Sequence, residues 1–192
     1  MGMPDALHRW TRDEVLALPD DGNRYELIDG ELLVSPSPRL LHQWAVAALF
    51  RRVDPYVRAH RVGVTGFAPS DLDLKSGQMV QPDLYVVALL QDGREPRDWP
   101  ECGIPLLVAE VLSPSTARRD RFTKRRRFQN SGVAYYWIVD LDARAFEHWQ
   151  PGDARPGIIE DQIEWWPAGA PVPSVIDLPE FFREVHGERA ES

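Results

Sequence analysis

A single acidic residue inside an otherwise apolar run most constrains how this 192-residue chain can fold. Residues 106–112 read Leu-Leu-Val-Ala-Glu-Val-Leu, so Glu110 is the only polar side chain in the run. A segment that is apolar on both faces predicts a central strand that is covered on both sides. A carboxylate there is costly to bury unless it is protonated, ion-paired or bound to a metal. Glu110 is therefore a candidate functional residue. The alternative is a structural carboxylate at a strand end, where it meets solvent or an arginine.

A second acidic residue precedes another apolar strand. Asp83 follows Pro82 and is itself followed by the apolar residues 84–89. A proline before a strand marks a first position or an edge, so Asp83 is expected at the mouth of that strand. If the two strands are neighbours, Asp83 meets Glu110. Paired carboxylates are the oxygen ligands that Mg²⁺ prefers, and Mn²⁺ uses similar ones. A loop-capping aspartate is the alternative.

Basic residues are concentrated in one segment of an acidic chain. Residues 118–127 hold seven basic side chains and one acid, Asp120, whereas the whole chain has a formal net charge of −8. The segment carries +6, which leaves −14 for the remainder. Such a segment can place a phosphate backbone locally, and Arg118, Arg119 and Arg121 are the candidates for that contact. A solvated helix face balanced by neighbouring acids is the alternative.

Lys124 stands out within this basic segment because it is surrounded by arginines. A helix predicted from residues 113 to 132 places Lys124 in line with Phe128, on the side that faces the sheet. Lysine is a compact point charge that can activate water or stabilise charge developing at phosphorus. A salt bridge to Asp120, one turn earlier, is the alternative.

Three further residues are weaker candidates for the same site. His42 lies on the apolar stripe of a helix predicted over residues 37–58, where a lone histidine is more often a core residue than a ligand. Glu26 and Glu31 flank a hairpin turn predicted at residues 29–30. Either glutamate could add an acid to the site, and their spacing does not choose between them.

The order of the predicted elements indicates an α/β domain with a mixed sheet. The length suits one domain over residues 1–187, with a disordered tail at residues 188–192. The single cysteine, Cys102, excludes an intramolecular disulfide and fits a cytoplasmic location. Nowhere do 18 apolar residues run together, so no membrane span is expected.

Several motifs carry a resemblance to a known family. They are Tyr25-Glu26-Leu27-Ile28-Asp29-Gly30-Glu31-Leu32, Gln81-Pro82-Asp83, Glu110-Val111-Leu112-Ser113-Pro114-Ser115-Thr116 with Lys124 downstream, and Tyr136-Trp137-Ile138-Val139-Asp140. Together they resemble the Uma-two family of restriction endonucleases, within the PD-(D/E)XK nuclease superfamily. The resemblance implies a restriction-endonuclease-like core, a mixed β-sheet flanked by helices.

The same resemblance implies a metal-dependent phosphodiesterase site in which Asp83 and Glu110 are the motif acids. The superfamily's usual lysine follows the acid by two positions, where this chain has Leu112. Lys124 matches the family's lysine on the following helix. Tyr135 stands where the family tends to have a glutamate, so the chain departs from the pattern there.

Two functions follow as hypotheses. The first is an Mg²⁺- or Mn²⁺-dependent endonuclease acting on DNA. Asp83, Glu110 and Lys124 would be catalytic. Asp83 and Glu110 would hold the metal with the help of Glu31 or Glu26, and of His42. The second is a catalytically inactive nuclease-fold module that binds or dimerises, which the charge of −8 favours. A homodimer would suit cleavage of two strands.

Overall fold

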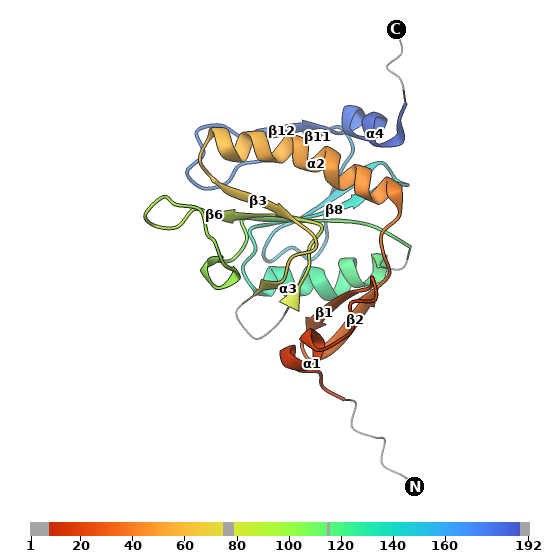
Figure 1. Ribbon diagram of the computed structural model, residues 1–192. Helices are drawn as coiled ribbons and strands as arrows, with labels where there is room; N and C mark the ends of the chain where they lie inside the picture. The colour runs from red at the N-terminus through yellow and green to blue at the C-terminus, as the bar shows by residue number, and fades with distance from the viewer. Residues whose placement is uncertain (1–7, 75–78, 115, 189–192) are drawn as a thin grey trace.

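A six-stranded mixed sheet is the centre of the computed structural model, which describes residues 8–74, 79–114 and 116–188 (Figure 1). Its strands run in the order β10 (Gly157–Ile159), β9 (Ala145–Trp149), β8 (Tyr135–Asp140), β7 (Leu107–Val111), β6 (Leu84–Ala88) and β3 (Gly63–Phe67). Strands β7 and β8 are parallel, and the other neighbouring pairs are antiparallel. The predicted α/β architecture with a mixed sheet is confirmed.

Strand β7 is the predicted central strand, and all five of its residues are buried. Leu107, Ala109 and Val111 pack on one face of the sheet with residues of α2 (Leu40–Ala59) and α4 (Leu178–His186). Val108 belongs to the core on the opposite face, which includes Phe128. Because successive side chains of a strand alternate between faces, Glu110 points to the same side as Val108.

That opposite face is covered by the basic helical segment and by a small sheet (Figure 1). The helical segment consists of the π-helix η2 (Arg119–Lys124) followed by α3 (Arg125–Asn130). The small sheet has the order β2 (Glu31–Ser35), β1 (Arg24–Ile28), β5 (Met79–Val80) and β4 (Leu72–Asp73). The remaining elements are α1 (Arg12–Leu16), the 3₁₀ helix η1 (Trp99–Glu101), and the paired strands β11 (Gln162–Trp165) and β12 (Ser174–Asp177).

Two predicted helices begin later than expected, namely α2 and the segment predicted from residue 113, which starts with η2 at Arg119. The hairpin turn lies at Asp29 and Gly30, whose φ angles of 53° and 82° suit a two-residue turn. The helix expected from Ser37 begins instead at Leu40, and the Ser37 hydroxyl donates to the Gly22 carbonyl at 2.8 Å. Arg39 has an extended backbone, with φ −70° and ψ 157°, so it is the N-cap residue and the helix starts after it.

Two predicted segments fall partly or wholly outside the described residues. Residues 75–78, where the sequence Lys-Ser-Gly-Gln predicts a turn, lie outside them, as do Ser115 and residues 189–192. Glu188, the first residue of the expected disordered tail, is described. Its amide donates to the Arg183 carbonyl at 2.9 Å, and its carboxylate pairs with Arg144. Within the described ranges, no helix combines the length and apolarity needed to cross a bilayer.

Candidate active site

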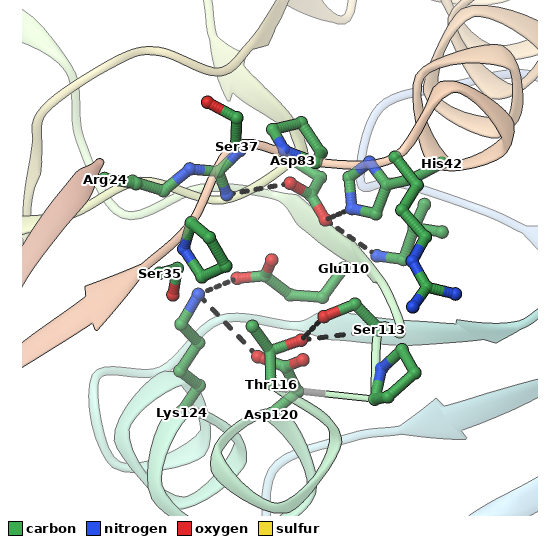
Figure 2. A pocket seen from close by; sticks show the side chains of 15 residues that line it. Arg24, Ser35, Ser37, His42, Asp83, Glu110, Ser113, Thr116, Asp120 and Lys124 are labelled. Carbon is green, nitrogen blue, oxygen red and sulfur yellow. Dashed lines mark hydrogen bonds and ion pairs between the residues drawn. The ribbon is translucent and has the colours of Figure 1, made fainter. Parts of the chain in front are cut away.

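Strand pairing brings Asp83 and Glu110 to one place. Strand β6 begins where its antiparallel neighbour β7 ends, and Leu84 pairs with Ala109. Asp83, immediately before β6, accepts a hydrogen bond from the Val111 amide at 2.9 Å. Both carboxylates line one cavity of about 270 Å³ (Figure 2). The two acids therefore lie at neighbouring strand ends, as expected from the sequence.

Three donors hold the Asp83 carboxylate. Besides the Val111 amide, Arg24 donates from Nη1 to Oδ1 at 2.8 Å, and His42 Nε2 lies 3.0 Å from Oδ2 (Figure 2). Burial alone would raise the pKa of Asp83. The hydrogen bond and charge of His42, together with the charge of Arg24, outweigh burial, so this pKa lies well below its ordinary value. Asp83 therefore stays ionised.

The Lys124 amine is buried and surrounded by carboxylates. Nζ lies 2.9 Å from Glu110 Oε1, 2.9 Å from Glu26 Oε2 and 3.7 Å from Asp120 Oδ1. Burial would lower the pKa of Lys124, but the adjacent acids, Glu110 first, raise it well above its ordinary value. Glu26 is fixed in turn by the Gln81 amide, which donates to its Oε1 at 2.8 Å. The lysine is thus a permanent cation held in one position.

The acids of this cluster outnumber its permanent cations. Four carboxylates (Glu26, Asp83, Glu110 and Asp120) surround the guanidinium of Arg24 and the amine of Lys124, which leaves two excess negative charges if every acid is ionised. Burial raises the pKa of Glu110 well above its ordinary value and that of Asp120 to about 6, because nearby carboxylates add to the effect and Lys124 offsets only part of it. Bound protons or one divalent cation would neutralise this excess.

The donor set fits a hard divalent cation with an incomplete protein shell. Asp83 and Glu110 offer carboxylate oxygens to the same cavity. Among the described residues, no group of three or more His, Cys, Asp or Glu side chains could hold a metal ion. Two carboxylates with water and substrate phosphate are a usual environment for Mg²⁺, which rarely occupies all-protein cages.

The position of Lys124 follows from helix geometry. Asp120, Lys124 and Phe128 are spaced by four residues and are all buried on the inner side of the helical segment. The prediction that Lys124 faces the sheet beside Phe128 is confirmed. Lys124 belongs to the wide turn of the π-helix η2, a local distortion that is frequent at functional sites.

The structure separates the two candidate glutamates of the hairpin. Glu26 reaches Lys124, whereas Glu31 is exposed at the start of β2. Ser35, at the other end of β2, lines the cavity, and four residues of strand span about 13 Å. Glu31 is thus too far along the strand to join Asp83 and Glu110, and it lines a different cavity with Arg118 and Arg119.

His42 does reach the site, through Asp83. Its Nε2 contacts the carboxylate, while its Nδ1 is buried without a hydrogen-bond partner among the described residues. The imidazole lines the cavity from α2, which packs on the opposite face of the sheet from α3 (Figures 1 and 2). Its one polar contact makes it a support for Asp83.

The three candidate phosphate-binding arginines have different surroundings. Arg118 is exposed, and Arg119 donates from Nη1 to the Val34 carbonyl at 2.7 Å. Arg121 pairs with Asp140 at 2.8 Å and with Glu147 at 2.5 Å. The charge of Arg121 is therefore satisfied within the protein, which separates it from the other two.

Comparison with known proteins agrees with this geometry. The family described as "Uma2: Putative restriction endonuclease" matches residues 12–179. The chain belongs to the Uma2 family. A solved structure with a similar fold is described as a putative nuclease belonging to DUF820 from Anabaena variabilis ATCC 29413. It has a TM-score of 0.69 and 17% sequence identity, over 92% of this chain and 99% of that one. No curated protein matches.

Sequence reasoning missed the two arginines that line the cavity of this Uma2 chain, Arg24 and Arg39. A signal for Arg24 existed, since strand periodicity places it on the same face of β1 as Glu26. Arg39 had no comparable signal. It is the N-cap residue of α2, and its approach to the cavity depends on how the preceding loop packs.

Proposed function

We propose that this chain is a divalent-metal-dependent endonuclease that hydrolyses phosphodiester bonds of nucleic acid. The observation that carries the proposal is the buried Lys124 amine, held at a cavity wall beside the carboxylates of Asp83 and Glu110. Hydrolysis at phosphorus needs fixed positive charge near the developing negative charge, together with a means of activating water. A cavity that combines a fixed cation with metal-type ligands meets both requirements.

Asp83 and Glu110 would hold the metal, Mg²⁺ or Mn²⁺, with water and substrate phosphate as the other ligands. When bound, such an ion lowers the pKa of a coordinated water and neutralises charge on the phosphate. The excess of two carboxylates over permanent cations in the buried cluster supports this assignment, as do the two carboxylates that line the cavity.

The chain's own residues have separate roles in this proposal. The Lys124 amine is a compact cation that can donate a hydrogen bond to a phosphoryl oxygen or orient the attacking water. Glu26 holds that amine in place through its ion pair. His42 and the Arg24 guanidinium fix the rotamer of Asp83 from two sides. Such supporting contacts matter because a misplacement of about 1 Å can cost roughly 100-fold in rate.

One observation favours the second hypothesis, a nuclease-fold module without turnover. Both oxygens of Asp83 already accept hydrogen bonds, from Arg24 on one side and from His42 and the Val111 amide on the other. A carboxylate engaged in this way can serve purely as the centre of a structural ion-pair cluster. Activity of the purified protein decides between the two.

The test is cleavage of supercoiled plasmid and single-stranded DNA with Mg²⁺, with Mn²⁺ and with EDTA. Wild type should cut only with metal, and Asp83→Ala and Lys124→Ala should abolish cutting. Asp161→Ala changes an exposed aspartate outside the cavity and should cut like wild type. Equal residual nicking by all four proteins would show contamination and would reject the endonuclease.

Metal binding can be tested separately from cleavage. A ligand that binds the native state raises the melting temperature, so saturating Mn²⁺ should raise the Tm of wild type. Asp83→Ala should lose this increase, and Asp161→Ala should keep it. We further propose DNA as the substrate. We also propose a homodimer as the cutting unit, and light scattering on the purified protein would check its molar mass.

A further inference from the structure

A second cavity, of about 440 Å³, lies along the outer side of the same helical segment. Its wall consists of Glu31, Arg118, Arg119, Phe122, Thr123 and Arg126. The residues at positions 118, 122 and 126 are spaced by four and form one line along the helix. This line is offset by two residues from that of Asp120 and Lys124, so it lies on the opposite side.

The guanidinium charges of this outer cavity are mostly unneutralised. Arg118 and Arg126 are exposed and make no hydrogen bond or ion pair within residues 8–74, 79–114 and 116–188. Among the described residues, Arg119 makes one hydrogen bond, to a carbonyl, and Glu31 is the one acid on the wall. The outer cavity is therefore positive on a chain whose formal net charge is −8.

An aromatic ring stands in the middle of these charges. Phe122 is 58% exposed, with Arg118 one turn before it and Arg126 one turn after it. Single exposed apolar residues are common and need no explanation. An exposed ring flanked by two unpaired guanidiniums is more specific, because sites for single-stranded nucleic acid combine aromatic rings that stack on bases with basic groups that follow the backbone.

We propose that this outer cavity holds an unpaired nucleotide of a single-stranded nucleic acid. The base would stack on Phe122, and adjacent phosphates would contact Arg118 and Arg126. A duplex satisfies this site poorly, since its bases are paired and stacked in its interior, where a surface ring does not reach them.

The outer cavity and the candidate active site are separate, and β2 connects them. Arg119 contacts the carbonyl of Val34, and the next residue, Ser35, lines the catalytic cavity. A strand anchored on Phe122 could therefore extend past Arg119 towards Lys124. This inference rests on the proposed nuclease function for its reaction, and it names the substrate class as nucleic acid with an unpaired segment.

The first test measures binding in EDTA, so that no strand is cut. Fluorescence anisotropy would follow a labelled single-stranded thymidine oligonucleotide, its uridine RNA counterpart and a DNA duplex of equal length. Phe122→Ala should weaken binding of a single strand about ten-fold or more, the effect of losing one stacked base, and should change duplex binding little. Phe122→Trp should restore binding, whereas Phe122→Leu, which keeps apolar area without a π-face, should not.

The second test uses the salt dependence of the same binding. Each phosphate contact on a single strand adds about 0.7 to the slope of log K against log salt. The double variant Arg118→Ala/Arg126→Ala should therefore lower that slope by about 1.4. Two exposed residues elsewhere serve as controls, and Arg155→Ala and Phe67→Ala should leave both slope and affinity unchanged.

Two results would overturn the inference. One is single-strand binding by Phe122→Ala that is as tight as that of wild type. The other is displacement of the oligonucleotide by polyglutamate as effectively as by unlabelled oligonucleotide, which would mark a surface for acidic proteins. Single-strand binding that depends on Phe122 supports the inference, and comparison of the two oligonucleotides shows whether the site takes DNA, RNA or both.

Failure of this inference is distinguishable from failure of the proposed nuclease function. Phe122-dependent binding without any metal-dependent cleavage would reject the nuclease and keep the single-strand site. Metal-dependent cleavage by wild type, together with single-strand binding by Phe122→Ala as tight as that of wild type, would keep the nuclease and reject the single-strand site.

Discussion

The inner and outer sides of one helical segment use charge in opposite ways. On the inner side, Asp120 and Lys124 are buried, and the lysine contacts three carboxylates. On the outer side, Arg118 and Arg126 are exposed and unpaired within the described ranges. Both sides hold two charged side chains, so burial and pairing, not the number of charges, distinguish the rigid inner cluster from the exposed outer surface.

The largest effect is expected from removing the inner cation. Lys124→Met would leave Glu26 and Glu110 as buried carboxylates without their partner, and breaking a buried ion pair from one side typically costs about 3–5 kcal/mol. The free energy of unfolding in urea at neutral pH should fall by that amount. Wild-type stability in Lys124→Met would show that the acids are already protonated and that the lysine carries no structural charge.

A pH-dependent effect of comparable size is expected at Asp120. Its pKa is raised to about 6, so its contribution to stability is complete below the ordinary value of 3.8 and is lost as the pH rises through about 6. Asp120→Asn removes this loss. The free energy of unfolding of Asp120→Asn minus that of wild type, both measured in EDTA, should rise by up to about 3 kcal/mol from pH 4 to pH 8.

The matched control for this titration is Asp161→Asn, which changes an exposed aspartate. Its stability difference from wild type should be the same at both pH values. A difference for Asp120→Asn that does not change with pH would mean that the Asp120 carboxyl is not destabilised by burial in the native state.

The two glutamates that contact Lys124 should differ in their effects on cleavage. Glu110 lines the cavity and is a proposed metal ligand, so Glu110→Gln should abolish both cleavage and the rise in Tm with Mn²⁺. Glu26 holds the amine from behind, so Glu26→Gln should keep the rise in Tm and lose about 10- to 100-fold in kcat, as supporting residues of metal sites do. Equal loss of the Tm response in both variants would place Glu26 among the ligands.

Local rules were sufficient to predict the inner side of this comparison. Glu110 stands out because a strand covered on both faces tolerates no idle carboxylate, and Asp83 because Pro82 marks the start of a strand. Lys124 follows from its helical spacing to Phe128. Each rule uses neighbours in sequence, and the structure brings these three side chains together.

What sequence could not supply depends on contacts between distant segments. The choice of Glu26 over Glu31 depends on which end of the hairpin lies against Lys124. The internal pairing of Arg121 depends on Asp140 and Glu147, which lie on β8 and β9. Neither contact leaves a periodic signal, so the arginines of the basic segment could not be sorted into structural and exposed groups from the sequence.

The smallest effect on stability is expected on the outer side. Arg126→Met and Phe122→Ala remove exposed side chains, and surface substitutions of this kind usually change the free energy of unfolding by less than about 0.5 kcal/mol. Urea unfolding beside Lys124→Met gives a direct contrast along one helix. A loss of more than about 2 kcal/mol in either outer variant would mean that the outer residues support the fold as the inner ones do, because only a packed or paired side chain produces so large a change.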